Sequence, residues 1–183
     1  MKGHLPVRYF PIFVDLDHQP VLVVGGGEQA AQKVRLLART TATIKIVAAE
    51  LCPELEAAVA AGRAEWLASA FSPDQLDGCR LAYAAIDDLT EAARIAFAAR
   101  ARGVPVNAID RPQLCSFITP AIVDRDPVVV AIGSEGTAPV LVGRIRARLE
   151  AELPAALGAV ARFAQGLRRR VVASLPDGRS RRA

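Results

Sequence analysis

Residues 21–30 read Val-Leu-Val-Val-Gly-Gly-Gly-Glu-Gln-Ala, a short apolar run that leads directly into three glycines. This order is typical of a strand, a tight turn and the start of a helix that binds a dinucleotide pyrophosphate. Gly25 can make the turn, Gly27 lets the backbone approach a phosphate, and Ala30 lets the helix sit close to the strand. The free N–H groups of the helix N-terminus would then face the anion. The alternative is an ordinary strand-to-helix turn.

Further apolar stretches alternate with helical ones, which is typical of a parallel, doubly wound sheet. Strands are predicted over residues 21–24, 43–48, 65–67, 81–85 and 104–108, and helical segments over 29–38, 53–61, 73–76 and 88–102. The carboxyl ends of parallel strands share one edge, where ligands bind. We therefore expect the segments after the strands to converge on one cleft, namely residues 25–27, 48–50, 86–88 and 107–110.

The pattern changes after Pro112. Two β-rich runs, 116–123 and 127–133, flank residues 124–126 and predict an antiparallel hairpin. A lone hairpin is only marginally stable in water, so a partner subunit is a candidate to cover it. Helices are predicted over 138–152 and 155–173. The predicted organisation is a Rossmann-like α/β domain (1–112), a β region (113–137), a small helical domain (138–174) and a disordered tail (175–183).

The composition narrows the class of protein. Lys and Arg outnumber Asp and Glu by 23 to 19, and many arginines crowd the carboxyl end. Aromatic residues make up only 5% and do not interleave with basic ones, so no nucleic-acid partner is expected. A solvated helix face or a polyanionic small molecule would account for the basic excess. No apolar stretch approaches the roughly 20 residues of a membrane span and no secretory signal is visible, so a cytoplasmic protein without membrane contact is expected.

No metal site is expected. Cys52, Cys79 and Cys115 are far apart and have neither metal-type nor disulfide-type spacing. His4 and His18 stand alone without ligand-like neighbours.

Two acids follow predicted strands. Glu50 lies near the end of the second strand, where a ribose-binding acid is expected, although a surface residue at a turn fits equally well. No arginine follows that strand at once, which favours NAD over NADP. Asp110 lies just past the fifth strand and is either a turn aspartate or a carboxylate at the cleft edge that takes a proton.

The loop over residues 133–139 joins the hairpin to a helix. Its hydroxyls, backbone N–H groups and helix N-terminus suit an anion, and the alternative is a plain connector with Thr137 as helix cap. The arginines that follow, Arg144, Arg146 and Arg148, can bind carboxylates. At least one of them is expected to pair with Glu150 or Glu152 instead.

Together these segments resemble the siroheme-synthase dehydrogenase family, whose members are precorrin-2 dehydrogenases and in many cases also sirohydrochlorin ferrochelatases. The resemblance covers about Tyr9 to Arg170. It rests on these motifs in order: Tyr9-Phe-Pro-Ile-Phe13, Val23-Val-Gly-Gly-Gly27 with Ala30 and Lys33, Ala84-Ala-Ile-Asp-Asp88, Asn107-Ala-Ile-Asp110, Ser116-Phe-Ile-Thr-Pro120 and Gly136-Thr-Ala-Pro-Val-Leu141.

The resemblance implies an NAD-binding Rossmann domain, a dimerisation region and a homodimer in siroheme biosynthesis. It implies oxidation of precorrin-2, a tetrapyrrole with eight carboxylates, to sirohydrochlorin, with hydride transfer to NAD. The family's essential aspartate matches Asp110, which would accept a proton or assist metal entry. The cofactor segment matches Gly25, Gly26, Gly27, Glu28, Gln29, Ala49 and Glu50. Substrate contacts are expected from Asn107, Ser134, Thr137, Arg144 and Arg146.

Two departures from the family pattern concern the substrate. The family loop reads Ser-Gly-Gly-Thr-Ser-Pro, and here Glu135 adds a negative charge while Ala138 removes a donor. An arginine common in the next helical turn falls at Gly143. Ser134 matches a serine that is phosphorylated in some relatives. The fused methyltransferase domain of some relatives is expected to be absent, so that another enzyme supplies precorrin-2.

Three functions stay open at this point. The leading one is the NAD-dependent dehydrogenase, with Fe²⁺ insertion as a second activity that the sequence does not decide. The alternatives are a non-catalytic NAD-sensing regulatory module and a chelatase that has lost oxidation.

Overall fold

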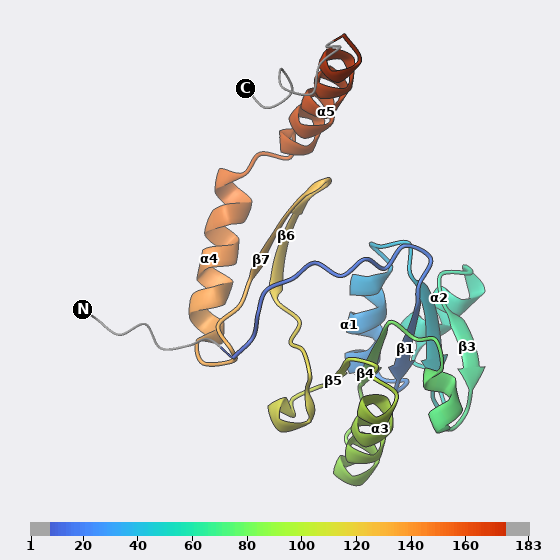
Figure 1. Cartoon of the computed structure of the whole chain (residues 1–183). Coiled ribbons are helices and arrows are strands. Elements are labelled where there is room, and N and C mark those ends of the chain that lie inside the picture. Colours follow the sequence, from blue (N-terminus) through green and yellow to red (C-terminus); the bar gives the residue numbers. More distant parts are fainter. Residues whose placement is uncertain (1–7, 175–183) are drawn as a thin grey trace. The chain divides into compact units, whose positions relative to one another are not determined.

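The computed structural model describes residues 8–174, with side chains up to residue 170, and divides into two compact units between Ile118 and Thr119 (Figure 1). The predicted tail over 175–183 and His4 lie outside the described residues. Over residues 8–174, none of the helices combines the length and the apolar character that crossing a bilayer requires.

The first unit contains a five-stranded parallel sheet in the order β3-β2-β1-β4-β5. The strands are β1 (Pro20–Val24), β2 (Thr43–Val47), β3 (Glu65–Ala68), β4 (Leu81–Ala84) and β5 (Val106–Ala108). The predicted doubly wound sheet is confirmed. The strand order reverses between β1 and β4, which is the place where open α/β sheets bind ligands outside their carboxyl ends.

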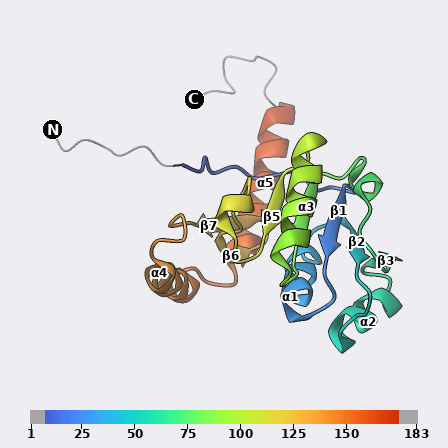
Figure 2. The same cartoon turned by 90° about the horizontal axis from the view of Figure 1, so that it is seen from below.

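Helices cover both faces of this sheet (Figure 2). The helical segments are α1 (Glu28–Leu37), α2 (Pro53–Ala60), the short 3₁₀ turn η1 (Pro73–Leu76), α3 (Leu89–Ala101) and the 3₁₀ turn η2 (Pro112–Leu114). Val21 and Val23 of β1 pack with α1 and α2, whereas Leu22 and Val24 pack with α3. Because successive side chains of a strand point to opposite faces, this apolar run supplies both cores.

The second unit combines a hairpin with two helices. The elements are β6 (Ala121–Arg125), β7 (Val128–Ile132), α4 (Pro139–Glu152) and α5 (Leu157–Ser174), and the two strands pair antiparallel as predicted. The predicted turn at residues 124–126 is wrong, because it begins two residues too early and ends one residue too early. Arg125 pairs with Val128, so Asp126 and Pro127 form the turn.

The predicted start of the hairpin at residue 116 is also wrong. The backbone N–H of Ser116 donates to the carbonyl oxygen of Val106 at 2.8 Å, and its Oγ accepts from the Val106 N–H at 2.7 Å. These bonds keep Ser116 with β5 in the first unit. Strand β6 therefore begins at Ala121.

Candidate functional site

The first two glycines of the turn after β1 touch two other loops. Gly25 has φ +132°, and a Cβ there would lie 2.1 Å from the carbonyl oxygen of Ala85. A Cβ on Gly26 would lie 1.8 Å from the carbonyl oxygen of Glu50. The Gly26 carbonyl also accepts from the N–H of Cys52 at 2.7 Å. The loops after β1, β2 and β4 thus meet at positions where only glycine fits.

Gly27 differs from its neighbours because a Cβ there would meet nothing within 4 Å. It is the N-cap of α1, and no side chain caps this helix. The N–H groups of the first helical turn, which include those of Glu28 and Gln29, are therefore free of any side-chain cap. An open helix N-terminus next to a residue without Cβ is suited to a phosphate.

The side chain of Glu28 is negatively charged and is therefore not itself a ligand for an anion at this site. Its carboxylate lies 3.6 Å from Nη2 of Arg35, about two turns farther along α1. A carboxylate in the first turn stabilises the helix dipole. The groups of residue 28 that can meet an anionic cofactor are those of its backbone.

Ala49 and Glu50 form a bend directly after β2, and both are exposed. The backbone of Glu50 is held against Gly26, which leaves its carboxylate at the surface beside the glycine turn. The geometry is compatible with a ribose contact at the end of β2. That role stays a prediction.

Asp110 lies on the same edge of the sheet as the glycine turn. Two backbone bonds continue the ladder past the strand ends, from Ala85 N–H to Val24 at 2.7 Å and from Ile109 N–H to Ala84 at 3.0 Å. Asp110 follows directly, exposed and with φ +58°. Three sequence segments are thereby joined at one rim, as the parallel arrangement predicts.

Lys33 of α1 is a further candidate for a functional residue, to which the sequence analysis assigned no role. Its Nζ lies 5.8 Å from the centre of the Tyr83 ring, and it is half-buried. Burial lowers the pKa of Lys33, and the charge of Asp110 partly raises it. The sequence indicates that Lys33 is partly buried, because Lys33 shares a helix face with the buried Ala30, Val34 and Leu37.

Asn107 has a different environment from the one expected of a substrate ligand. It is only 8% exposed, and its Nδ2 donates to the carbonyl oxygen of Phe117 at 3.0 Å. This bond helps to hold the segment after η2 against β5. A substrate contact by Asn107 stays a prediction that the structure does not favour.

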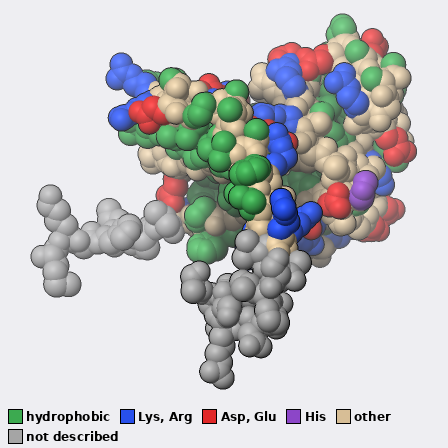
Figure 3. Space-filling model, turned by 90° about the horizontal axis from the view of Figure 1, so that it is seen from above, with side chains coloured by type: hydrophobic (Ala, Val, Ile, Leu, Met, Phe, Trp, Pro, Cys, Tyr) green, Lys and Arg blue, Asp and Glu red, His purple; other side chains and the backbone are tan. Residues whose placement is uncertain are grey.

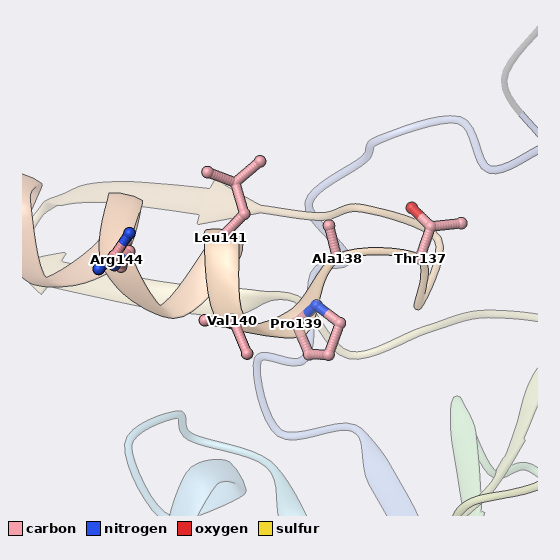
Figure 4. Close-up of a pocket in the computed structure, with 6 residues that line it drawn as sticks. All are labelled: Thr137, Ala138, Pro139, Val140, Leu141 and Arg144. Carbon is pink, nitrogen blue, oxygen red and sulfur yellow. The ribbon is translucent and has the colours of Figure 1, made fainter.

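In the second unit, Ser134 and Thr137 bond to the turn that contains them. Oγ of Ser134 accepts from the Ala138 N–H at 3.2 Å, and the Thr137 hydroxyl donates to the Ser134 carbonyl oxygen at 2.5 Å. The alternative, in which Thr137 caps α4, is wrong, because its hydroxyl donates within this turn and α4 has no side-chain cap hydrogen bond. A shallow hollow of about 410 Å³ opens beside the helix start (Figure 4), lined by Thr137, Ala138, Pro139, Val140, Leu141 and Arg144.

The three arginines of α4 are not equivalent. Arg146 lies 2.9 Å from Glu150, and Arg148 lies 2.6 Å from Glu152, which confirms the expected pairing. Arg144 has no acidic partner within the part of the chain that the structure describes, and it lines the hollow (Figure 4). Arg144 is therefore the most available cation for an incoming carboxylate.

Residues 12–121 match the model of a family described as "Putative NAD(P)-binding". A siroheme synthase of Methylobacillus flagellatus is 47% identical over 172 residues, which cover 94% of this chain and 37% of that protein. A siroheme synthase of Zymomonas mobilis is 48% identical over 174 residues, again 37% of its length. The chain thus spans little more than a third of these curated relatives.

A solved structure named SirC, precorrin-2 dehydrogenase, has the same fold. The TM-score is 0.72 at 21% sequence identity, over 94% of this chain and 85% of that one. The family model spans the glycine turn, Glu50 and Asp110 together, and it covers well over half of the sequence. On this match, the chain belongs to the NAD(P)-binding family.

Proposed function

We propose that this chain oxidises precorrin-2 to sirohydrochlorin and transfers the hydride to NAD. The observation that carries the proposal is the position of Asp110 on the same sheet edge as the uncapped start of α1. The identity of about 47% with siroheme synthases and the shared fold with SirC support it. NAD, when bound, supplies the hydride acceptor.

The nucleotide is proposed to lie across the glycine turn. The backbone at Gly25, Gly26 and Gly27 and the N–H groups of Glu28 and Gln29 would hold the pyrophosphate. The bend at residues 49–50 would contact the adenosine ribose. This arrangement would put anionic phosphates at the positive end of α1, which has no side-chain cap hydrogen bond.

Asp110 is proposed as the proton acceptor. Dehydrogenation removes a hydride and a proton from adjacent atoms of the macrocycle. Bound NAD would accept the hydride, and the Asp110 carboxylate would accept the proton. The exposed carboxylate then releases the proton to solvent, which restores the site for the next turnover.

Substrate carboxylates are proposed to bind the loop and helix of the second unit. Arg144 is the strongest candidate, and Ser134, Thr137 and the open N–H groups at the start of α4 add donors. Arg146 can contribute only by giving up its pair with Glu150. Glu135 opposes a polyanion, which predicts weaker binding than a glycine would allow.

The chain is proposed to work as a homodimer. The antiparallel hairpin of the second unit has two strands only, and Val129 is 40% exposed. Hydrophobic side chains reach the surface (Figure 3), and those of α4 and α5 include Val140, Leu141, Ile145, Val160, Phe163 and Leu167. A second copy that covers this surface would stabilise the hairpin. Sedimentation at several protein concentrations tests this: a monomer at all concentrations would contradict it.

The decisive experiment mixes the purified chain with precorrin-2, with and without NAD, and records sirohydrochlorin absorption. We expect growth of that absorption only with NAD, and a weaker response with NADP. Asp110→Ala should bind NAD with unchanged affinity and lose about 100-fold or more in kcat. Asp110→Asn is the matched variant, because asparagine keeps the left-handed backbone and removes only the base.

Each alternative has its own outcome in this assay. Normal oxidation by Asp110→Ala refutes the role of Asp110. NAD binding without any oxidation favours the NAD-sensing module. Iron insertion into supplied sirohydrochlorin, with no response to NAD, favours the chelatase, and the same Fe²⁺ arm decides whether the dehydrogenase has a second activity.

A further inference from the structure

Asp110 occupies the left-handed backbone region, which L-residues rarely adopt. Its φ is +58°, and the N–H of Arg111 donates to the carbonyl oxygen of Ala108 at 3.2 Å, which closes a tight turn around residues 109 and 110. The left-handed region is unfavourable for an ordinary L-residue and less so for aspartate. Neighbouring contacts must therefore hold Asp110 in place.

The side chain of the next residue supplies such a contact. Nη1 of Arg111 donates to the carbonyl oxygen of Ile86 at 2.8 Å, and Nη2 donates to the carbonyl oxygen of Asp87. One planar guanidinium thus binds two consecutive carbonyls of the loop after β4. Its fork geometry makes both bonds at once, which a single ammonium group does not reproduce.

The loop that receives Arg111 is itself well anchored. Before it, the N–H of Ala85 donates to the carbonyl oxygen of Val24 at 2.7 Å. After it, the Asp88 carboxylate accepts from the N–H groups of Thr90 and Glu91 at 2.7 and 3.0 Å and caps α3. Hydrogen bonds therefore fix the backbone on both sides of residues 86 and 87, and these are the residues that Arg111 binds.

Asp110 is the one residue between two attachment points. On one side, Ile109 is bonded to Ala84 at the end of β4 at 3.0 Å. On the other, Arg111 is bonded to the residues just past β4, and Pro112 restricts its backbone away from the helical region. Both attachments lead to the same neighbouring strand end.

We propose that Arg111 is a positioning residue for Asp110. The Arg111 guanidinium ties the loop after β5 to the loop after β4 and so holds the Asp110 carboxylate in place at the sheet edge. The catalytic consequence rests on the proposed function. In this role Arg111 acts through Asp110, because its guanidinium donates to backbone carbonyls of the neighbouring loop.

The first test measures the tie without any substrate. Arg111→Ala should speed amide hydrogen exchange at Ile109 and Arg111 by about tenfold or more, through local opening, while β1 amides keep their protection. Arg102→Ala is the matched control, since Arg102 also donates to two oxygens, of Asp77 at 3.0 Å and Asp74 at 3.4 Å, at the other end of α3. It should leave exchange at residues 109–111 unchanged.

The second test measures positioning in the precorrin-2 assay. A carboxylate displaced by about 1 Å loses up to about 100-fold in rate, so Arg111→Ala should lower kcat by 10- to 100-fold with less than a twofold change in the Kd for NAD. The kcat of Arg111→Lys should lie between that of Arg111→Ala and that of the parent chain. In the Asp110→Ala background, Arg111→Ala should cause no further loss.

Three outcomes decide the matter. Unchanged exchange at residues 109–111 in Arg111→Ala overturns the tie. Faster exchange with unchanged kcat, or an additional loss on top of Asp110→Ala, overturns the positioning role. If the parent chain does not oxidise precorrin-2, the proposed function fails, and the exchange measurement still decides whether Arg111 holds Asp110.

Discussion

Gly26 and Gly27 are adjacent, yet each is glycine for a different reason. At Gly26 a Cβ would overlap the carbonyl oxygen of Glu50 at 1.8 Å, so glycine is required by the fold. At Gly27 nothing lies within 4 Å, and the backbone at φ −90° suits any residue. The space beside Gly27 therefore suits a ligand and is not needed for packing.

This contrast predicts opposite effects for two neighbouring substitutions. Gly26→Ala should lower the free energy of unfolding by about 2–3 kcal/mol, because the clash is with backbone that cannot move away cheaply. Gly27→Ala should unfold like the parent chain and bind NAD at least about tenfold more weakly, a loss of about 1.4 kcal/mol. Denaturant unfolding measures the stability of each variant, and NAD titration measures its affinity for NAD. Equal NAD affinity in Gly27→Ala would contradict a phosphate at this turn.

Lys33 carries an energetic cost that depends on pH. Burial lowers its pKa in the folded chain, so between that value and the ordinary lysine pKa of about 10.4 the unfolded chain holds more protons. Stability therefore rises with pH through this window, and the cost of the buried charge is complete below it. A residue that costs stability at neutral pH is a candidate for function.

Replacement by an apolar side chain of similar length tests this. Lys33→Met should be at least as stable as the parent chain at pH 7, and its advantage should shrink as the pH approaches 10. Urea unfolding of both chains at several pH values gives the difference in free energy. A difference that grows with pH would mean that burial does not dominate the pKa of Lys33.

The hairpin and α5 meet at a glycine in the second unit. A Cβ on Gly158 would lie 2.0 Å from the carbonyl oxygen of Asp126 at the hairpin turn. Nη1 of Arg162, one turn later, donates to the same carbonyl oxygen at 2.7 Å and lies 3.1 Å from the Asp126 carboxylate. The first turn of α5 thus packs directly on the end of the hairpin.

Two glycines of α5 give a matched pair of substitutions. Gly158→Ala should destabilise the second unit by about 1–3 kcal/mol, because the helix must move off the hairpin turn. A Cβ on Gly166 would meet nothing within 4 Å. Gly166→Ala should therefore be neutral or stabilising by up to about 1 kcal/mol, since alanine favours a helix. Hydrogen exchange of the β6 and β7 amides measures the stability of the second unit in each variant. Similar protection in both variants would contradict the packing role of Gly158.

The division into two units has a thermodynamic consequence. The glycine turn, Glu50 and Asp110 all belong to the first unit, so NAD should stabilise that unit alone. At 100 times its Kd, NAD should add about 2.7 kcal/mol to the unfolding of the unit that binds it. The amides of β1 and β4 should gain protection, and those of β6 and β7 should not. Equal gains in both units would show that the two unfold together.

Much of the fold follows from local patterns. The apolar runs, the glycines after the first run and the acid that caps α3 are properties of short segments, and each predicts its own strand, turn or helix. A parallel sheet then follows, because alternation of strands with helices is typical of parallel strands. The same rule predicts that Gly25 and Asp110 share an edge, although 85 positions separate them in the sequence.

Other features depend on atoms that distant segments bring together. The need for glycine at position 26 arises from the backbone of Glu50, and the burial of Asn107 arises from the carbonyl of Phe117. Ser116 looked like the start of a strand, but its bonds to Val106 place it elsewhere. No periodicity contains such information, because these are contacts between backbone groups whose partners are chosen by packing.

The sequence alone therefore establishes the order of the elements, the parallel sheet and the edge on which the candidate site lies, since hydrophobic spacing and turn chemistry act within a few residues. The fold decides the left-handed backbone of Asp110, the tie from Arg111 to Ile86 and Asp87, and the half-buried charge of Lys33. These depend on tertiary contacts, because a strained turn or a buried charge persists only where the surrounding structure holds it.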